Sequence, residues 1–181
     1  MIRVISGIYR GKRLKKVNSS STRPMPDKLK TALFNILRDE IAGTTVLDGF
    51  AGTGSIGIEA LSRGAEQVVF VEEFPVALSV LRHNVAKLGA PEQTRIVALE
   101  FNRGVIQLAR ENFRFDIIFL DPPYRLLDER NPLKVIRKRS VLAPGGLIVL
   151  RHHFKTRFEG RFFELKRRTT LGDDALSFYG E

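Results

Sequence analysis

The chain has 181 residues, a formal net charge of +10 and 43% hydrophobic residues. This length is enough for one domain with a substantial core. Cysteine is absent, which excludes disulfides and thiolate metal sites, and we expect no metal. No apolar run approaches the length of a membrane span, and the N-terminus predicts a strand rather than a signal peptide. We therefore expect a cytoplasmic protein with no membrane partner.

The positive charge is concentrated near the N-terminus. Residues 1–30 contain nine lysines and arginines against a single acid, Asp27, which gives a net +8 of the chain's +10. Such a charge favours a polyanionic partner. A solvated basic surface would also explain it, but the concentration in one segment favours nucleic acid.

The same segment predicts a small structural unit. Residues 2–17 alternate loosely between apolar and polar residues around glycines, which indicates a β-hairpin. A basic hairpin with one aromatic residue is suited to gripping RNA. Residues 18–21 read as a flexible linker, so we expect a hairpin extension over 1–21 and a compact domain over 22–181. The hairpin residues that would contact RNA are Arg3, Tyr9, Arg10, Lys12 and Arg13.

A helix is predicted next, with Asp27 near its start, apolar residues at helical spacing from Leu29 to Leu37, and Gly43 at its end. From residue 44, strands and helices alternate, which predicts a doubly wound, mostly parallel α/β sheet. The expected parallel strands are 44–48, 67–72, 95–99, 115–120 and 146–151, the helices lie near 54–63, 75–88, 103–112 and 132–141, and two antiparallel strands close the chain near 162–165 and 175–179.

A glycine-rich turn follows the first of these strands. The strand ends at Asp48, glycines follow, and a helical pattern begins near Ile56. Gly52 and Gly54 lack a Cβ, so the turn can be tight and a ligand can approach the backbone closely. The helix start offers unpaired N–H groups. This arrangement predicts a cradle for a nucleotide-type cofactor.

Two cofactor classes fit this turn. The spacing Gly52-x-Gly54-x-x-Gly57 matches a dinucleotide fingerprint, and Glu72 ends the next strand, as a ribose-binding acid does. Asp48 argues against a pyrophosphate because two anions repel each other. It favours a cofactor with a cationic or amine end, such as S-adenosylmethionine, although Asp48 could also simply cap the turn. A nicotinamide dinucleotide is the remaining alternative.

A second site is predicted at Asp121-Pro122-Pro123-Tyr124, after the fourth strand. Ligands of such sheets bind at the carboxyl ends of the strands, so Asp121 and Asp48 are expected to be neighbours. Two prolines make a rigid turn with free carbonyls. Asp121 and a proline carbonyl could accept hydrogen bonds from a base amine, and Tyr124 could stack on the base, which aligns the amine for transfer. The alternative is a rigid turn that only ends a buried strand.

These residues resemble a known class. Asp48-x-Phe50-x-Gly52-x-Gly54 with Asp121-Pro122-Pro123-Tyr124 is similar to the S-adenosylmethionine-dependent amino-methyltransferases. Further segments resemble the bacterial 16S rRNA (guanine-N2) methyltransferases, the RsmD family. The likeness runs from residue 2 to about residue 124, and the last third of the chain matches only loosely. These segments are Arg3-Val4-Ile5-x-Gly7-x-Tyr9-Arg10-Gly11-x-x-Leu14, Thr22-Arg23-Pro24, Ala32-Leu33-Phe34-Asn35 and Gly57-x-Glu59-Ala60-Leu61-Ser62-Arg63-Gly64-Ala65.

The resemblance implies a Rossmann-like methyltransferase domain that uses S-adenosylmethionine. Its target would be the N2 amine of a guanine in small-subunit ribosomal RNA, free or in an assembled subunit, and we expect a monomer. In the cofactor site, Asp48 and the backbone of Gly52 and Gly54 would hold the methionine end, and Glu72 would bind the ribose hydroxyls. Phe50 is also expected to bind the cofactor. In the target site, Asp121, Pro122 and Pro123 would hold the amine, Tyr124 would stack on guanine, and the hairpin and Arg23 would contact the RNA.

Two positions depart from the family pattern. Glu100-Phe101 stands where the family often has a polar residue followed by a small one at the adenine, so Glu100 or a neighbouring group would bind adenine. Glu72 is followed by a second acid, Glu73, and Glu72 is preferred because it ends the apolar strand. Asn35 could face either the cofactor or water.

Two other functions remain open. The Asp-Pro-Pro-Tyr turn does not choose among base amines, so an adenine- or cytosine-amine methyltransferase acting on DNA is one alternative. The other is a non-catalytic RNA-binding protein on a methyltransferase scaffold, although a pure binder has no use for an intact cofactor turn.

Overall fold

The computed structural model describes residues 2–17, 25–123, 131–156 and 162–181. Its strands beyond the N-terminal hairpin are β3 (Thr45–Gly49), β4 (Gln67–Val71), β5 (Thr94–Val97), β6 (Phe115–Leu120), β7 (Leu142–His153), β8 (Glu164–Leu171) and β9 (Asp174–Gly180). They form one seven-stranded sheet in the order β5-β4-β3-β6-β7-β9-β8. The strands from β5 to β7 pair in parallel, whereas β9 pairs antiparallel with both β7 and β8. The predicted sheet, mostly parallel with antiparallel C-terminal strands, is confirmed.

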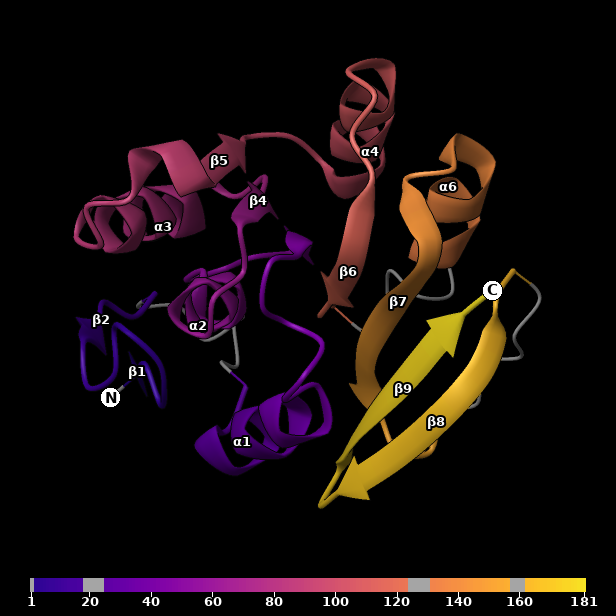
Figure 1. Cartoon of the computed structure of the whole chain (residues 1–181), viewed down its shortest axis with the longest axis horizontal. Helices are drawn as coiled ribbons and strands as arrows, with labels where there is room; N and C mark the ends of the chain where they lie inside the picture. The colour runs from indigo at the N-terminus through magenta and orange to yellow at the C-terminus, as the bar shows by residue number, and fades with distance from the viewer. Residues whose placement is uncertain (1, 18–24, 124–130, 157–161) are drawn as a thin grey trace.

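Helices cover both faces of this sheet (Figure 1). The helices are α1 (Asp27–Ile36), α2 (Ser55–Ser62), α3 (Pro75–Ala86), α4 (Phe101–Arg110) and α6 (Pro132–Arg139), with a short 3-10 turn, η1 (Pro91–Gln93), before β5. Successive strand residues point to opposite faces. In β3, Val46 therefore joins the core formed with α1, α2 and α3, and Leu47 joins the core formed with α4 and α6. No helix in the described part of the chain is long and apolar enough to cross a membrane.

The N-terminal hairpin is present but short. Strands β1 (Ile2–Arg3) and β2 (Arg13–Leu14) pair antiparallel, and the residues between them form turns. Ile2, Val4 and Leu14 are buried in the same core as α1 and α2. The expected linker at 18–21 lies outside the described residues.

The C-terminal strands differ most from their predicted bounds. Strand β7 begins at Leu142, before the predicted start at residue 146, and its pairing with β6 shifts register between Phe115 and Ile117. Strand β8 has 8 residues, although only 162–165 were expected to be extended at that position. Most of its residues are exposed because β8 is an edge strand of the sheet, so its sequence lacks the apolar alternation of a half-buried strand.

Candidate functional site

The turn between β3 and α2 is shaped by its glycines. Gly52 (φ +55°) and Gly54 (φ +76°) adopt left-handed conformations that cost glycine little. A Cβ at Gly54 would lie 2.5 Å from Leu81 Cδ1, and a Cβ at Gly57 would lie 2.4 Å from Phe70 Cε1. The glycines therefore let the turn close and let α2 pack directly on β4.

Asp48 is the buried acid of this turn, with 3% of its surface exposed. Its Oδ2 accepts a hydrogen bond of 2.8 Å from the Gly57 N–H in the first turn of α2. Burial raises the pKa of the Asp48 carboxyl to about 8; the Gly57 hydrogen bond opposes this, and the charges of Asp121 and Glu72 add to it. A carboxyl in such a place favours a proton or a cationic group beside it. Asp48 thus caps the turn and also has the chemistry to attract a cationic ligand.

Glu72 ties the end of β4 to the glycine turn. Its Oε2 accepts from the Gly52 N–H at 2.7 Å, and its Oε1 accepts from the N–H groups of Glu73 at 2.8 Å and Phe74 at 2.9 Å. Glu72 is buried, whereas Glu73 is exposed, so of the two acids it is Glu72 that lies in the turn. A carboxylate offers about four acceptor positions, so these three bonds leave room for a ligand hydroxyl.

Aromatic rings form the wall of the turn beside α4. Phe50 has φ +65°, which is uncommon for a side-chain-bearing residue. Its ring stacks on Phe101 with centroids 4.7 Å apart. A Cβ at Gly49 would lie 2.6 Å from Phe101 Cε2, so only glycine fits under this stack. Glu100 caps α4 by accepting from the Arg103 N–H at 3.1 Å, and a role in adenine binding stays a prediction.

Asp121 directly follows β6, the strand next to β3. The parallel register places Gly49 opposite Leu120, so the two strands end side by side. Asp121 is close enough for its charge to raise the pKa of Asp48. The two acids predicted to be neighbours therefore meet at one edge of the sheet. Pro122 is buried and Pro123 is exposed, whereas Tyr124 lies outside the described residues.

A buried arginine holds Asp121. Arg151 Nη1 donates to Asp121 Oδ2 at 3.0 Å, and Arg151 Nε donates to Asp174 Oδ1 at 2.9 Å. The Asp121 side chain is 32% exposed and that of Arg151 is 8% exposed. Burial raises the pKa of the Asp121 carboxyl, and the Arg151 guanidinium opposes this increase. The ion pair thus fixes one carboxylate oxygen of Asp121 and leaves the side chain partly open to solvent.

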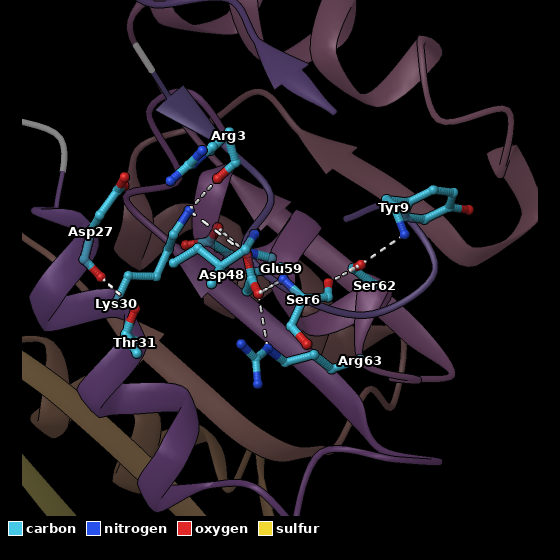
Figure 2. Close-up of polar contacts among 12 residues, drawn as sticks. Arg3, Ser6, Tyr9, Asp27, Lys30, Thr31, Asp48, Glu59, Ser62 and Arg63 are labelled. Atoms are coloured by element: carbon cyan, nitrogen blue, oxygen red, sulfur yellow. Dashed lines mark hydrogen bonds and ion pairs between the residues drawn. The ribbon is translucent and has the colours of Figure 1, made fainter. Parts of the chain in front are cut away.

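The basic hairpin is docked on α2 through a buried acid, Glu59 (Figure 2). The carboxylate of Glu59 accepts from the N–H groups of Ile5 at 2.7 Å and Ser6 at 3.0 Å, and from Arg63 Nε at 2.9 Å. Lys30 Nζ lies 3.7 Å from Glu59 Oε2. The same ammonium donates to the Arg3 carbonyl at 2.9 Å, as Figure 2 shows. Both Glu59 and Lys30 are fully buried, so this cluster links the hairpin, α1 and α2.

Ser62, one turn further along α2, holds the hairpin loop. Its Oγ accepts from the Tyr9 N–H at 2.9 Å and donates to the Ser6 carbonyl. Gly7 (φ +83°) lies so close that a Cβ there would be 1.6 Å from the Ser62 carbonyl oxygen. Of the predicted RNA contacts in the hairpin, Arg3, Arg10 and Arg13 are exposed and Tyr9 and Lys12 are half-buried; Arg23 lies outside the described residues.

Comparison with known proteins places this chain. A family model described as Conserved hypothetical protein 95 matches residues 2–180. The chain belongs to the Conserved hypothetical protein 95 family.

Relatives in this family share most of the chain. YlbH of Bacillus subtilis is 34% identical over 98% of both chains. Ribosomal RNA small subunit methyltransferase D of Escherichia coli is 38% identical over 152 residues, which are 81% of this chain and 72% of that protein. The solved structure of yhhF from Escherichia coli has a TM-score of 0.85 and 29% identity, and covers 98% of this chain and 96% of its own. The resemblance to the RsmD family and the Rossmann-like methyltransferase fold are confirmed, and the family match extends through the last third of the chain.

The sequence analysis did not predict a role for Arg151 or Asp174 in the site of this family member. The two residues come from β7 and β9, and no motif joins them. One sequence feature could have indicated Arg151: it directly follows an apolar strand segment. A charged residue that is buried at such a position needs a partner of opposite charge. Asn35, whose role was open, is exposed on α1.

Proposed function

We propose that this protein transfers the methyl group of S-adenosylmethionine to the N2 amine of a guanine in 16S ribosomal RNA. The observation that carries the proposal is the meeting of Asp48 and Asp121 at the ends of adjacent parallel strands. The relatives named ribosomal RNA small subunit methyltransferase D support ribosomal RNA as the substrate class. Such a substrate implies a cytoplasmic enzyme, which we expect to act as a monomer on free RNA or on an assembled subunit.

The glycine turn fits S-adenosylmethionine chemically. Gly52 and Gly54 both have positive φ, and a Cβ at Gly54 would collide with the buried Leu81 side chain, so the tight turn depends on these glycines. The buried Asp48 carboxyl favours the cationic amine of a methionine moiety, and Glu72 keeps acceptor capacity for a ribose hydroxyl. The cofactor supplies an electrophilic methyl group bound to a positively charged sulfur.

Asp121 and the prolines would act on the amine. Arg151 occupies Asp121 Oδ2, so we assign Oδ1 and the carbonyl of Pro122 or Pro123 as acceptors for the two N–H groups. Two acceptors favour a pyramidal nitrogen and direct its lone pair toward the methyl group, which is a contribution of alignment and charge. The nitrogen would bond to the methyl carbon while the methyl–sulfur bond breaks and leaves its electron pair on the sulfur. The nitrogen would then lose one proton, and we assign Asp121 as the acceptor for that proton. Stacking of guanine on Tyr124 stays a prediction.

The basic hairpin would bring the RNA to this site. Its exposed arginines suit phosphate contacts, which position a nucleic acid without reading its sequence. The target guanine would leave its stack to reach Asp121, as base-modifying enzymes require.

Asp121→Ala tests the proposal. We expect single-turnover transfer to 16S ribosomal RNA to fall by about 100-fold or more, because positioning and charge stabilisation are lost. The affinity for S-adenosylmethionine, measured by calorimetry, should change by less than about twofold. A tenfold loss, about 1.4 kcal/mol, would mean that Asp121 also binds the cofactor. The control is Asp116→Ala, which removes an exposed carboxylate at the opposite end of the same strand. Nucleoside mass mapping should find the added methyl group at N2 of guanine.

Three outcomes would count against this function. Loss of cofactor binding with unchanged single-turnover transfer would contradict the role of Asp121. Higher activity on bare duplex DNA than on ribosomal RNA would favour a DNA amino-methyltransferase. No detectable binding of S-adenosylmethionine would favour a non-catalytic RNA-binding protein.

A further inference from the structure

A groove separates the end of the hairpin segment from the start of α3. It has a volume of about 440 Å³ and is lined by Lys15, Lys16, Pro75, Val76, Ser79 and Val80. None of its lining residues belongs to the site described above.

The two walls of this groove differ in chemistry. Lys15 and Lys16 are exposed and supply two ammonium groups on one side. On the other side Val76 is 61% exposed, and Phe74, which directly precedes the lining residue Pro75, is 55% exposed. Large apolar side chains exposed together are unusual on a protein surface and indicate an interaction site. Ammonium groups in the groove and an exposed aromatic residue next to it match a nucleotide, which combines a phosphate with a flat base.

The lysine wall is held in place by one buried amide. Asn84 Oδ1 accepts from the Lys15 N–H at 2.8 Å, and Asn84 Nδ2 donates to the Lys15 carbonyl at 3.1 Å. Asn84 is fully buried in α3. The backbone of Lys15 is therefore fixed, and only its side chain must be ordered when a ligand binds.

Both walls also connect to the glycine turn. Asn84 Nδ2 donates to the Thr53 carbonyl at 2.9 Å. Glu72 accepts from the Phe74 N–H at 2.9 Å and from the Gly52 N–H at 2.7 Å. Hydrogen bonds thus connect both walls of the groove to the glycine turn.

We propose that this groove binds a single-stranded segment of the RNA substrate, with a base against Phe74 and Val76 and its phosphates on Lys15 and Lys16. This inference rests on the proposed function, which makes RNA the substrate. An acidic peptide would satisfy the lysines but would leave the aromatic ring without a matching surface. The groove extends the hairpin's phosphate contacts with a stacking contact for a nucleotide outside the methylation pocket.

Two variants separate the two kinds of contact. Affinity is measured by fluorescence anisotropy with a short fluorescein-labelled single-stranded RNA, over a series of salt concentrations. Lys15→Gln/Lys16→Gln should weaken binding about fivefold or more and lower the salt slope by up to about 1.4, since each phosphate contact on a single strand contributes about 0.7. Phe74→Ala should weaken binding about five- to 100-fold and leave the slope unchanged, because stacking releases no counterions. Phe74→Tyr should retain the affinity.

Controls keep the test specific. Lys134→Gln/Lys138→Gln removes two exposed charges from α6, on the other face of the sheet, and should leave the affinity unchanged. All altered residues are exposed, and calorimetry with S-adenosylmethionine should give the wild-type affinity for each variant.

The possible results distinguish failure of the groove proposal from failure of the proposed function. If the wild-type protein binds RNA and both groove variants bind it equally well, the groove proposal is wrong and the proposed function stands. If Phe74→Ala weakens cofactor binding instead of RNA binding, Phe74 belongs to the cofactor site and the proposal is also wrong. If the wild-type protein binds neither this RNA, nor 16S ribosomal RNA, nor the small subunit, the proposed function itself fails.

Discussion

Asp48 is a residue that destabilises the ligand-free protein and that would be stabilised when a cationic ligand binds. Its carboxyl is buried beside two other acids, and its pKa is raised to about 8. In the unfolded chain the same group ionises near its ordinary value of about 3.9. Between these values the folded protein holds a proton that the unfolded chain has released, so this residue makes folding less favourable as pH rises. A cationic ligand beside the carboxylate would remove this cost.

We predict that Asp48→Asn stabilises the ligand-free protein at pH 8 relative to wild type. The amide oxygen can still accept from the Gly57 N–H. The wild-type protein should lose up to about 1.4 kcal/mol per pH unit relative to the variant as pH rises from about 4 to about 8, and the difference should then level off. Urea unfolding of both proteins across this range measures it. Parallel stability curves would show that Asp48 is ionised in the folded protein.

At the scale of elements, Arg151 joins three strands around the target site. It lies on β7, holds Asp121 after β6, and pairs with Asp174 at the start of β9. The C-terminal hairpin of β8 and β9 is therefore connected to the residue that we assign to the amine. Guanidinium geometry matters here because the Nε and Nη1 atoms bind different carboxylates, which a single ammonium group cannot reproduce.

We predict that Arg151→Met lowers kcat about 10- to 100-fold, with cofactor affinity near that of wild type, because Asp121 loses its orientation. Without the cation, the pKa of Asp121 rises, so the acidic limb of the activity profile should move to higher pH. Arg151→Lys should restore part of the activity. The control is Arg137→Met, which removes an exposed ion pair with Glu181. An unshifted pH profile would mean that Arg151 has only a structural role.

Helices and strands could be predicted from the sequence where their burial produces a periodic pattern of apolar residues. Alternating apolar strands and helices predicted the parallel sheet, and Asp48 and Asp121 could be placed together because parallel strands end at one edge. Strand β8 was predicted too short because an exposed edge strand carries no such pattern. Arg151 and the hairpin's docking on Glu59 could not be predicted, since both depend on partners from distant elements that no local spacing records.

At the scale of the whole molecule, the charge is distributed unevenly. Nine basic residues against one acid lie in the first thirty residues. The described part of this segment packs on α2 and α3 through buried polar groups, so its charges are presented on a fixed surface. A fixed basic surface loses less conformational freedom when it binds RNA than a mobile tail does.

We predict that Arg10→Ala/Lys12→Ala/Arg13→Ala weakens binding to 16S ribosomal RNA and flattens its salt dependence, by up to about 2 in slope if all three contact phosphates. Filter binding over a salt series measures both effects. The control has the same charge change on α6: Arg137→Ala/Lys138→Ala/Arg139→Ala. An equal loss in both variants would show that overall charge, and not the hairpin surface, attracts the RNA.

Gly7 sets a limit on how this surface can vary. Its missing side chain lets the hairpin loop touch the Ser62 carbonyl, and a Cβ there would overlap that oxygen at 1.6 Å. If the segment slipped by one position along α2, Ser6 or Ile8 would have to occupy this place, and neither fits. The hairpin therefore packs on the body of the protein in a single register, and this register determines where the exposed side chains of Arg10 and Arg13 lie.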